Sequence, residues 1–230
     1  MRSAEYSTIR QLARVAGQPG LDLIGSIAPG DGAMRGQMEA FVRSRFAEVY
    51  GARVSRLMPE LIGLFRSGEL LAVIGLRPAV GGPLFLETYL DLPACQMLRQ
   101  RTGIPLARDH LVEVGNLAAA TPGAARLLIS ALTHYLAHRG FAWVVFTGTP
   151  MLLNSFRRLT LSPVDLGPAD PARLGDERVE WGSYYATQPR VMGGHVPGGL
   201  AQLHCRGVLE REGYQPMYDV LHPGAVHACA

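Results

Sequence analysis

A short stretch of the chain, residues 110–126, holds the side chains best suited to chemistry. Glu113 and Asn116 lie three residues apart on a predicted strand that runs from His110 to Ala118. A carboxylate can accept a proton from an attacking amine, and an amide side chain can orient an acceptor or a carbonyl. Each residue also has a simpler interpretation. Glu113 is then a satisfied structural carboxylate, and Asn116 bonds its own backbone beside a bulge.

The elements around these residues predict a groove. Gly115 interrupts the apolar and polar alternation of the strand, which indicates a β-bulge with unpaired N–H groups. Thr121 and Pro122 then supply the N-cap and N1 residues of a helix over about 123–139. A second apolar strand follows at 141–147, and a right-handed crossover makes it parallel to the first. If the two strands part at the bulge, backbone amides in the gap can bind a thioester.

The composition of the whole chain limits the fold and the class of partner. Its 230 residues, of which 48% are hydrophobic, suffice for one large mixed α/β domain. The net charge of +3 gives no support to nucleic-acid binding. All 22 basic residues are Arg, which reflects either genome composition or the docking of an acidic carrier protein.

Targeting signals are not evident in the sequence. No apolar run approaches the ~20 residues that span a bilayer, and the first residues do not form an apolar signal segment. Cys95, Cys205 and Cys229 are widely spaced and odd in number, so we interpret them as reduced thiols. We therefore expect a cytoplasmic protein without a transmembrane segment.

Three regions are predicted along the chain. Residues 1–33, rich in Gly and Pro, form an irregular N-terminal arm, residues 34–192 form the main domain, and residues 193–230 form a C-terminal extension packed on that domain. The main domain begins with an amphipathic helix over 35–50.

Hydrophobic patterns predict the remaining elements. They indicate a hairpin of strands at 61–65 and 70–76, and a third strand at 84–90. A helix beyond Pro150 ends by Pro163, a loop covers 163–180, and a late strand over 179–191 carries aromatic residues. The segment 200–209 is interpreted as helical.

Six strings of residues, in this order, resemble one bacterial family, the thermostable hemolysin family: Leu57-Met-Pro59, Gly75-Leu-Arg-Pro78, Gly82-Pro-Leu-Phe-Leu-Glu-Thr-Tyr-Leu-Asp91, Val112-Glu-Val-Gly-Asn-Leu117, Trp143-Val-Val-Phe-Thr147 and Trp181-Gly-Ser-Tyr-Tyr185. The resemblance covers roughly residues 35–192. The family pattern is similar to that of acyl-homoserine lactone synthases and, more distantly, to the Gcn5-related N-acyltransferase fold. It implies a central twisted mixed sheet, splayed at a β-bulge and flanked by helices.

The resemblance also implies residue roles. It places Glu113 as the catalytic carboxylate, and the residues themselves add Asn116 and Tyr184 as catalytic candidates. Tyr184 is a general acid, a wall of the acceptor pocket, or simply a core residue beside an exposed Tyr185. The acyl donor would be bound by Gly115, Leu117, Gly123, Ala125, Arg126, Thr147 and Asn154, with phosphates at the helix N-terminus. The acceptor would be bound by Arg43, Phe46, Arg77, Glu87 and Trp181. Simple capping explains Thr147 and Asn154 equally well, and a cross-strand ion pair explains Arg77 and Glu87.

Two departures from the family patterns bear on the substrates. Ala120 stands where the coenzyme A loop has Gln or Arg, which mildly favours a carrier-borne phosphopantetheine over acyl-CoA as the donor. Glu60 is the only acid where the synthases have two Asp residues, so S-adenosylmethionine is doubtful as the acceptor. His134 and His138 are spaced like a metal pair, but no third ligand accompanies them, so no metal is expected. We expect no tightly bound cofactor.

The predicted function is therefore transfer of a fatty acyl group from an acyl-CoA or acyl-carrier-protein thioester to a small amine. Two alternatives stay open. The family name suggests direct action on membranes, which needs an exposed amphipathic segment. A non-catalytic module that binds an acyl carrier would keep the groove without the activity.

Overall fold

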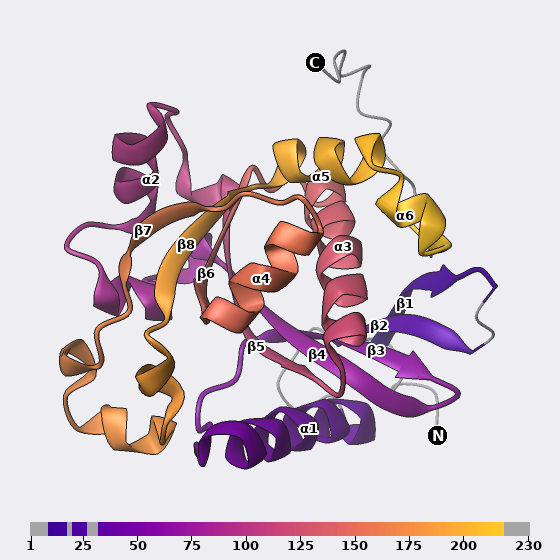
Figure 1. Cartoon of the computed structure of the whole chain (residues 1–230), viewed down its shortest axis with the longest axis horizontal. Coiled ribbons are helices and arrows are strands. Elements are labelled where there is room, and N and C mark those ends of the chain that lie inside the picture. The colour runs from indigo at the N-terminus through magenta and orange to yellow at the C-terminus, as the bar shows by residue number, and fades with distance from the viewer. Residues whose placement is uncertain (1–8, 18–19, 27–31, 219–230) are drawn as a thin grey trace, which may run out of the picture.

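The computed structural model describes residues 9–17, 20–26 and 32–218. Its strands are β1 (Ile9–Val15), β2 (Leu21–Ser26), β3 (Glu60–Arg66), β4 (Glu69–Pro78), β5 (Leu111–Ala119), β6 (Trp143–Gly148), β7 (Val164–Pro168), β8 (Arg190–His195) and β9 (Tyr214–Pro216). Within the described ranges they form one nine-stranded sheet in the order β7-β8-β6-β5-β4-β3-β2-β1-β9. Figure 1 shows this sheet flanked by helices, as the predicted mixed α/β fold requires.

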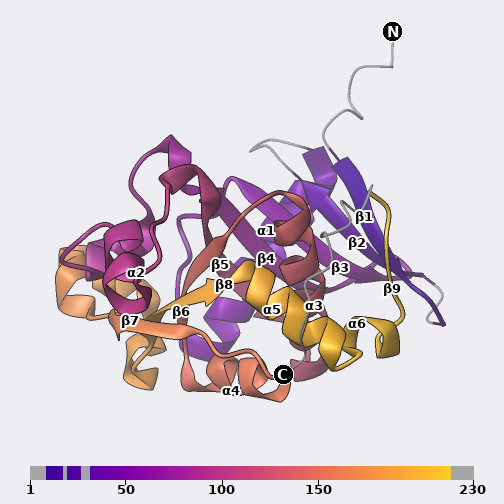
Figure 2. The ribbon, with the colours of Figure 1, turned by 90° about the horizontal axis from the view of Figure 1, so that it is seen from above.

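The helices connect the strands. The α-helices are α1 (Gly32–Tyr50), α2 (Ala94–Thr102), α3 (Pro122–His138), α4 (Pro150–Arg158), α5 (Val196–Cys205) and α6 (Val208–Arg211). Short 3-10 helices are η1 (Ala79–Gly81), η2 (Phe85–Tyr89), η3 (Arg108–His110), η4 (Pro171–Trp181) and η5 (Tyr184–Thr187). Figure 2 shows α3, α5 and α6 side by side, and these three helices contact one another.

The two faces of the sheet have separate cores. Successive side chains of a strand point to opposite faces. Ile74 and Val114 pack with Leu132 of α3 in one buried cluster. Val73 packs with Met38 of α1 in another. Helix α3 therefore covers one face of the central strands and α1 covers the other.

The predicted parting of two neighbouring strands is confirmed. Strands β5 and β6 are parallel and pair from Leu111 with Trp143 to Val114 with Phe146. From Gly115 on, β5 pairs only with β4 among the described strands, while β6 continues beside β8. The later backbone edges of β5 and β6 therefore face each other without joining, which opens the sheet from within.

The β-bulge lies one residue later than predicted. Asn116 and Leu117 together oppose Ile74 on β4, and Asn116 has a φ of 52°. An Asn tolerates this left-handed backbone better than most residues, because its short polar side chain can bond locally. Gly115 is therefore not the bulged residue, and the reason for its lack of a side chain is found at the site.

Local signals predicted the start of α3 and the hairpin correctly. The Thr121 side chain caps α3 by accepting a 3.2 Å hydrogen bond from the Ala124 amide, and Pro122 is the first helical residue. The predicted strands at 61–65 and 70–76 are β3 and β4, joined by a tight turn.

The N-terminal prediction is wrong for the part that the structure describes. Residues 1–33 were expected to be irregular, yet β1 and β2 pair with each other and β2 pairs with β3. Leu12, Val15 and Leu21 are buried in the core. The glycines at 17 and 20, with φ near 75°, flank the connection between the two strands. These strands extend the same sheet, so this segment is not a separate arm.

The expected strand at 84–90 is the 3-10 helix η2. The backbone amides that a strand would pair with a neighbour donate instead to carboxylates. Leu84 donates to Glu87, and Phe85 and Leu86 donate to Glu113. Side-chain acceptors therefore replace the strand ladder here.

The expected loop and late strand near residues 163–191 are also wrong in part. The loop region contains β7 and η4, and the aromatic residues at 181, 184 and 185 lie in η4 and η5. Of the strand expected over 179–191, only the part from Arg190 on is a strand, and it begins β8. Gly182 explains the departure, because its φ is 52° and a Cβ there would lie 2.1 Å from the carbonyl oxygen of Tyr50.

The predicted boundary at residue 192 falls inside β8, and the described part of 193–230 forms α5, α6 and β9. Cys95 is a free thiol, whereas Cys205 is disulfide-bonded, so the expectation of reduced cysteines is wrong for Cys205. Cys229 lies outside the described residues. Among the helices of the described chain, none is long and apolar enough to cross a bilayer.

Candidate active site

A cavity of about 1090 Å³ lies where β5 and β6 part, and residues from both faces of the sheet line it. One end, here called the aromatic chamber, is lined by Phe46, Tyr50, Phe85, Trp181, Tyr184 and Tyr185. The other end, here called the apolar chamber, is lined by Val114, Leu132, Val144, Phe146, Leu152 and Phe156.

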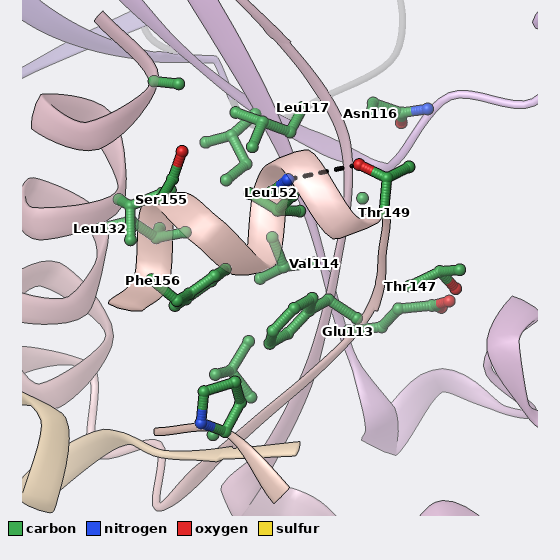
Figure 3. A pocket seen from close by; sticks show the side chains of 18 of the residues that line it. Glu113, Val114, Asn116, Leu117, Leu132, Thr147, Thr149, Leu152, Ser155 and Phe156 are labelled. Atoms are coloured by element: carbon green, nitrogen blue, oxygen red, sulfur yellow. Dashed lines mark hydrogen bonds between the residues drawn. The ribbon is translucent and has the colours of Figure 1, made fainter. Parts of the chain in front are cut away.

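The two chambers belong to opposite faces of the sheet. The apolar chamber residues pack in the core cluster that contains α3. Phe46 packs with the α1 cluster, and Phe85, Trp181 and Tyr185 pack with the cluster that contains η2. Figure 3 shows Leu132 and Phe156 at one side of the pocket and Glu113 and Thr147 at the other. The cavity thus passes through the sheet at the opening between β5 and β6.

Glu113 lies at this opening and is 2% exposed. Its two carboxylate oxygens accept hydrogen bonds of 3.0 Å from the Phe85 amide and 2.9 Å from the Leu86 amide. Burial raises the pKa of this carboxyl, although the two backbone hydrogen bonds and the Arg77 guanidinium partly offset the effect. Glu113 is therefore a carboxylate with satisfied hydrogen bonds, as its simpler interpretation expected. The same carboxylate also lines the cavity, so its predicted role as proton acceptor stays a prediction.

Asn116 holds a neighbouring segment over the bulge. Its Oδ1 accepts a 2.7 Å hydrogen bond from the Met58 amide, and its Nδ2 lies 3.5 Å from the carbonyl oxygen of Arg56. The expected bond to its own backbone is not what the structure shows. The predicted catalytic role of Asn116 stays a prediction, and its observed contacts position the wall of the cavity.

Gly115 and Gly75, which face each other across β5 and β4, make room for Met58. A Cβ on Gly115 would lie 2.6 Å from the Met58 Cε, and a Cβ on Gly75 would lie 2.6 Å from the Met58 Cβ. Real side chains do not approach so closely. Gly75 is therefore needed for this close approach, whereas Gly115 meets only the flexible end of Met58. Gly115 lines the cavity, and its predicted role in donor binding stays a prediction.

Arg77 lines the cavity directly opposite Glu113 in the β4–β5 register. Residues directly opposite in an antiparallel pair point to the same face. Arg43, by contrast, was predicted to bind the acceptor and does not line the cavity. It pairs with Glu39 at 3.3 Å on the exposed side of α1. Arg45, two residues later on the helix, is the one that reaches the cavity.

Glu87 is a second correction among the predicted acceptor residues. It does not line the cavity, and its partner is Arg108 rather than Arg77. The two Arg108 Nη atoms lie 2.7 and 2.9 Å from the two Glu87 oxygens, and the Leu84 and Ala94 amides also donate to Glu87. Although burial opposes it, this set of donors lowers the pKa of Glu87. Glu87 therefore stabilises the turn that carries Phe85.

The aromatic chamber is a connected group of rings. Trp181 stacks on Phe85 with a centroid distance of 5.9 Å and contacts Tyr184 at 5.4 Å. Phe46 contacts Trp181 and Tyr184, each at 6.4 Å. Such contacts fix ring positions and leave flat apolar faces with negative potential. The predicted acceptor residues Phe46 and Trp181 both line this chamber.

The tyrosine hydroxyls of this chamber keep their protons. Burial raises the pKa of Tyr184 well above its ordinary value, and it raises the pKa of Tyr185 to about 12. The Tyr185 hydroxyl also forms a hydrogen bond with the Tyr89 hydroxyl. Tyr184 can therefore donate a hydrogen bond at neutral pH, but it does not act as a base.

The predicted donor residues divide into two groups. Residues that line the cavity are Gly115, Leu117, Ala125 and Thr147. Residues that do not line it are Gly123, Arg126 and Asn154. Asn154 is exposed on α4, because it lies on the turn opposite Leu152 and Phe156. The donor role predicted for these three residues finds no support in the cavity lining.

The sequence interpretation missed Thr149. This buried residue lines the cavity, and its Oγ1 caps α4 by accepting a 3.3 Å hydrogen bond from the Leu152 amide (Figure 3). The Tyr50 hydroxyl interacts with the same threonine from α1. The Thr-Pro pair that begins α4 was available as a signal, since the same pair marked the start of α3.

His134 and His138 on α3 both contact Tyr218. His134 Nδ1 lies 2.7 Å from the Tyr218 hydroxyl, and the His138 ring stacks on Tyr218 at 4.3 Å. Among the residues that the structure describes, no group of three His, Cys, Asp or Glu side chains is placed to hold a metal ion.

Comparisons with known proteins agree with this architecture. The family model described as Thermostable hemolysin matches residues 29–200. A search of the curated proteins finds no match. FeeM, an N-acyl amino acid synthase from uncultured soil microbes, is 18% identical with a TM-score of 0.50, and the match covers 78% of this chain and 95% of FeeM.

Two acyl-homoserine lactone synthases are similar to the same extent. BjaI, a CoA-dependent enzyme solved with SAM and isopentyl-CoA, has 14% identity and a TM-score of 0.54, over 86% of this chain and 89% of BjaI. LasI has 13% identity and a TM-score of 0.51, over 77% of this chain and 91% of LasI. The predicted fold is thereby confirmed.

Proposed function

Because this chain belongs to the thermostable hemolysin family and has the fold of acyl-homoserine lactone synthases, we propose that it is an N-acyltransferase. It transfers a fatty acyl group from a thioester to a small amine. The observation that carries this proposal is the cavity that passes through the sheet between β5 and β6. An acyl chain can occupy the apolar chamber while the amine occupies the aromatic chamber, so the thioester carbonyl lies at the opening.

The apolar chamber suits a fatty chain. Its lining is made of Leu, Val and Phe side chains from β5, β6, α3 and α4, and burial of each methylene there contributes about 0.8 kcal/mol. The Phe146 and Phe156 rings stack at 4.8 Å along its length. A pocket with this lining favours a long acyl chain over an acetyl group.

The opening supplies the groups that aminolysis of a thioester needs. The amine attacks the carbonyl carbon, a C–N bond forms, and the C–S bond then breaks to release the thiol. Glu113 accepts the ammonium proton directly or through a water, and the proton lost as the amide forms passes to the leaving sulfur. Backbone amides of β5 from Gly115 on have no strand partner on the β6 side, so they can donate to the carbonyl oxygen as it becomes negative.

The donor is an acyl-CoA or an acyl-phosphopantetheine on a carrier protein. Thr121, Pro122 and Ala125 bring the N-terminus of α3 to the rim of the cavity. A pantetheine arm that enters there runs along the free edge of β5. The carrier is the preferred donor, because Ala120 offers no side chain for an adenine nucleotide. No step of the proposed reaction requires a bound cofactor.

The test is release of free thiol. Purified protein is mixed with long-chain acyl-CoA, or with the same acyl group on a carrier protein, and with a broad panel of amines. A thiol reagent follows the release, and mass spectrometry identifies the amide. We expect amine-dependent release and a matching amide product. If neither donor gives amine-dependent thiol with any amine, the proposed function is wrong.

A further inference from the structure

We propose that the amine acceptor is a free α-amino acid with an aromatic side chain, and that Arg77 binds its carboxylate. This inference rests on the proposed function, because it identifies the substrate of the same site. Three features of the aromatic chamber carry it: the placement of two opposite charges, the absence of an ion pair at Arg77 among the described residues, and the set of ring faces.

The two charges at the opening match those of an amino acid. Glu113 and Arg77 face each other in the β5–β4 register, point to the same face of the sheet, and both line the cavity. Neighbouring strands bring directly opposite residues within about 5.5 Å at their Cα atoms. An α-amino acid carries its ammonium and its carboxylate on one carbon. A ligand with both groups can therefore bind Glu113 and Arg77 together.

Arg77 is available for such a ligand. The two Glu113 oxygens bond to backbone amides, and among the described carboxylates none lies within ion-pair distance of the Arg77 guanidinium. A partly buried guanidinium without a paired carboxylate favours an anionic ligand, and its planar fork fits a carboxylate in bidentate geometry.

The charge balance of the lining points the same way. Arg45 and Arg56 also line the cavity, whereas Glu113 is the only carboxylate among the described lining residues. The Arg45 Nε is buried without a hydrogen-bond partner, although its Nη1 pairs with Glu48. Glu48 pairs with Arg45 and Glu177 pairs with Arg56, so Arg77 is the arginine of this end that has no ion pair among the described residues. An acceptor with a carboxylate can pair with this guanidinium, whereas an amine without one cannot.

The rings define the rest of the acceptor. Among the six rings that define the chamber, Trp181 lies within stacking distance of both Phe85 and Tyr184. A flat aromatic side chain fills such a space with favourable offset or edge contacts, whereas a small side chain leaves it unfilled. FeeM, which has the same fold, is an N-acyl amino acid synthase.

Matched amine pairs test the inference. Phenylalanine and phenethylamine differ by the carboxylate alone, and alanine lacks the ring. We expect kcat/KM for phenylalanine to exceed that for each of the other two by at least about tenfold, since phenethylamine lacks a charged hydrogen bond and alanine lacks the apolar surface of the ring. Phenylalanine, but not phenethylamine, should also raise the melting temperature of the protein in the absence of a donor.

Variants separate recognition of the carboxylate from a structural role of Arg77. Arg77→Ala should reduce the ratio of phenylalanine to phenethylamine activity to about one, and Arg77→Lys should keep part of it. Arg101→Ala, on the exposed side of α2, is the matched control and should leave the ratio unchanged. A merely structural Arg77 would lower both activities equally and leave the ratio unchanged, which would overturn its assignment.

The outcomes distinguish the two proposals. If phenethylamine is used as well as phenylalanine, the acceptor class is wrong while the acyltransferase function stands. If S-adenosylmethionine is used much better than phenylalanine, the aromatic side chain is wrong. If no amine releases thiol and phenylalanine leaves the melting temperature unchanged, both proposals fail.

Discussion

The side-chain oxygen of Asn116 accepts a 2.7 Å hydrogen bond from the backbone amide of Met58. This bond joins the bulge of β5 to the segment between α1 and β3, which lies 58 residues earlier in the chain. The same segment is tied to η4, because Arg56 pairs with Glu177 at 2.5 Å and Ser55 donates to Glu180 at 2.8 Å. The wall of the aromatic chamber is therefore fixed from two sides.

The glycine pair beneath Met58 gives the first prediction. Gly75→Ala should destabilise the protein by about 1 to 3 kcal/mol, because its new Cβ would meet the Met58 Cβ and Cγ and approach Asn116 Oδ1. Gly115→Ala should cost less, since it meets the flexible end of Met58. Urea unfolding of each variant provides the measurement.

A second substitution serves as the control for this pair. Met58→Ala should rescue Gly115→Ala, because it removes the Cε that the new methyl would meet. It should not rescue Gly75→Ala, whose clash is with the Cβ that alanine keeps. Equal rescue of both variants would contradict the packing described here.

The carboxylate at the opening gives the second prediction. Glu113→Gln should lower amine-dependent thiol release by about 10² to 10⁴-fold, because the amide cannot accept the proton. The wild-type rate should rise with pH as Glu113 ionises. This rise should lie at higher pH than for an ordinary glutamate, since burial raises the pKa. A pH–rate profile of kcat/KM for both proteins checks this.

The fold of that variant must be verified separately. Glu113 holds two amides of η2, so Glu113→Ala should destabilise the protein by about 1 to 3 kcal/mol for each amide left unpaired. Glu113→Gln keeps one acceptor and should stay folded by circular dichroism. Wild-type turnover by folded Glu113→Gln would remove this residue from the chemistry.

The apolar chamber gives the third prediction. Leu152→Trp should shift the donor preference toward shorter acyl chains, because the indole occupies space that the chain needs. Competition between dodecanoyl and hexanoyl donors should show at least about a tenfold change in the ratio of kcat/KM. Asn154→Trp places the same side chain on the exposed side of α4 and should leave the ratio as it is. The same shift in both variants would count against the chamber as the chain site.

A buried carboxyl beside α3 gives the fourth prediction, which concerns stability. Burial raises the pKa of Glu212 to about 7 from 4.5, despite the Ser130 hydroxyl and the nearby arginines at 126 and 211. The folded state therefore keeps a proton that the unfolded state loses. This contribution is fully present below pH 4.5 and is lost as the pH rises to about 7.

Glu212→Gln should accordingly raise the unfolding free energy at pH 8 by on the order of 1 to 2 kcal/mol and change little at pH 4. His134 acts at the acid side, because burial lowers its pKa to about 4 from 6.5, so its contribution is lost as the pH falls through that range. Urea denaturation at pH 4, 6 and 8 measures how the unfolding free energy changes over the two pH ranges. Glu210→Gln, exposed on α6, is the control, and no gain from Glu212→Gln at pH 8 would refute the assignment.

The ion pair between Arg108 and Glu87 gives the fifth prediction. Arg108→Ala should lower stability, because it leaves a largely buried carboxylate with fewer donors, while the ratio of activities toward different amines stays as in the wild type. The low pKa of Glu87 means that its contribution is present above pH 4.5 and is lost as the pH falls. A changed acceptor preference in this variant would place Glu87 back in the acceptor site.

Local signals in the sequence predicted the opening between β5 and β6 and the start of α3 well. The interruption at Gly115, the Thr121-Pro122 pair and the apolar strand over 141–147 lie close together in the chain. Their geometry follows from the backbone preferences of Gly, Thr and Pro. The parting of β5 and β6 could therefore be predicted, even though the bulge itself lies at Asn116 rather than Gly115.

The aromatic chamber depends on contacts between distant segments. The segment at Phe85 and Leu86 forms a 3-10 helix because Glu113, far along the chain, accepts hydrogen bonds from their backbone amides. Alternation of apolar residues alone favoured a strand there. Likewise, Trp181 reaches Phe46 only because Gly182 lets the backbone approach Tyr50. Such pairings have no periodic signal in a single sequence.

The passage through the sheet has a consequence for turnover. If the fatty tail lies on one face of the sheet and the head group on the other, the finished amide passes through the opening between β5 and β6. The pairing of β5 with β6 up to Val114 and Phe146 closes one side of the opening. Release of the product then requires the tail to leave the apolar chamber, and each added methylene makes that step slower because more apolar surface is exposed. For the longest chains, release of the amide product rather than bond formation is then the rate-limiting step.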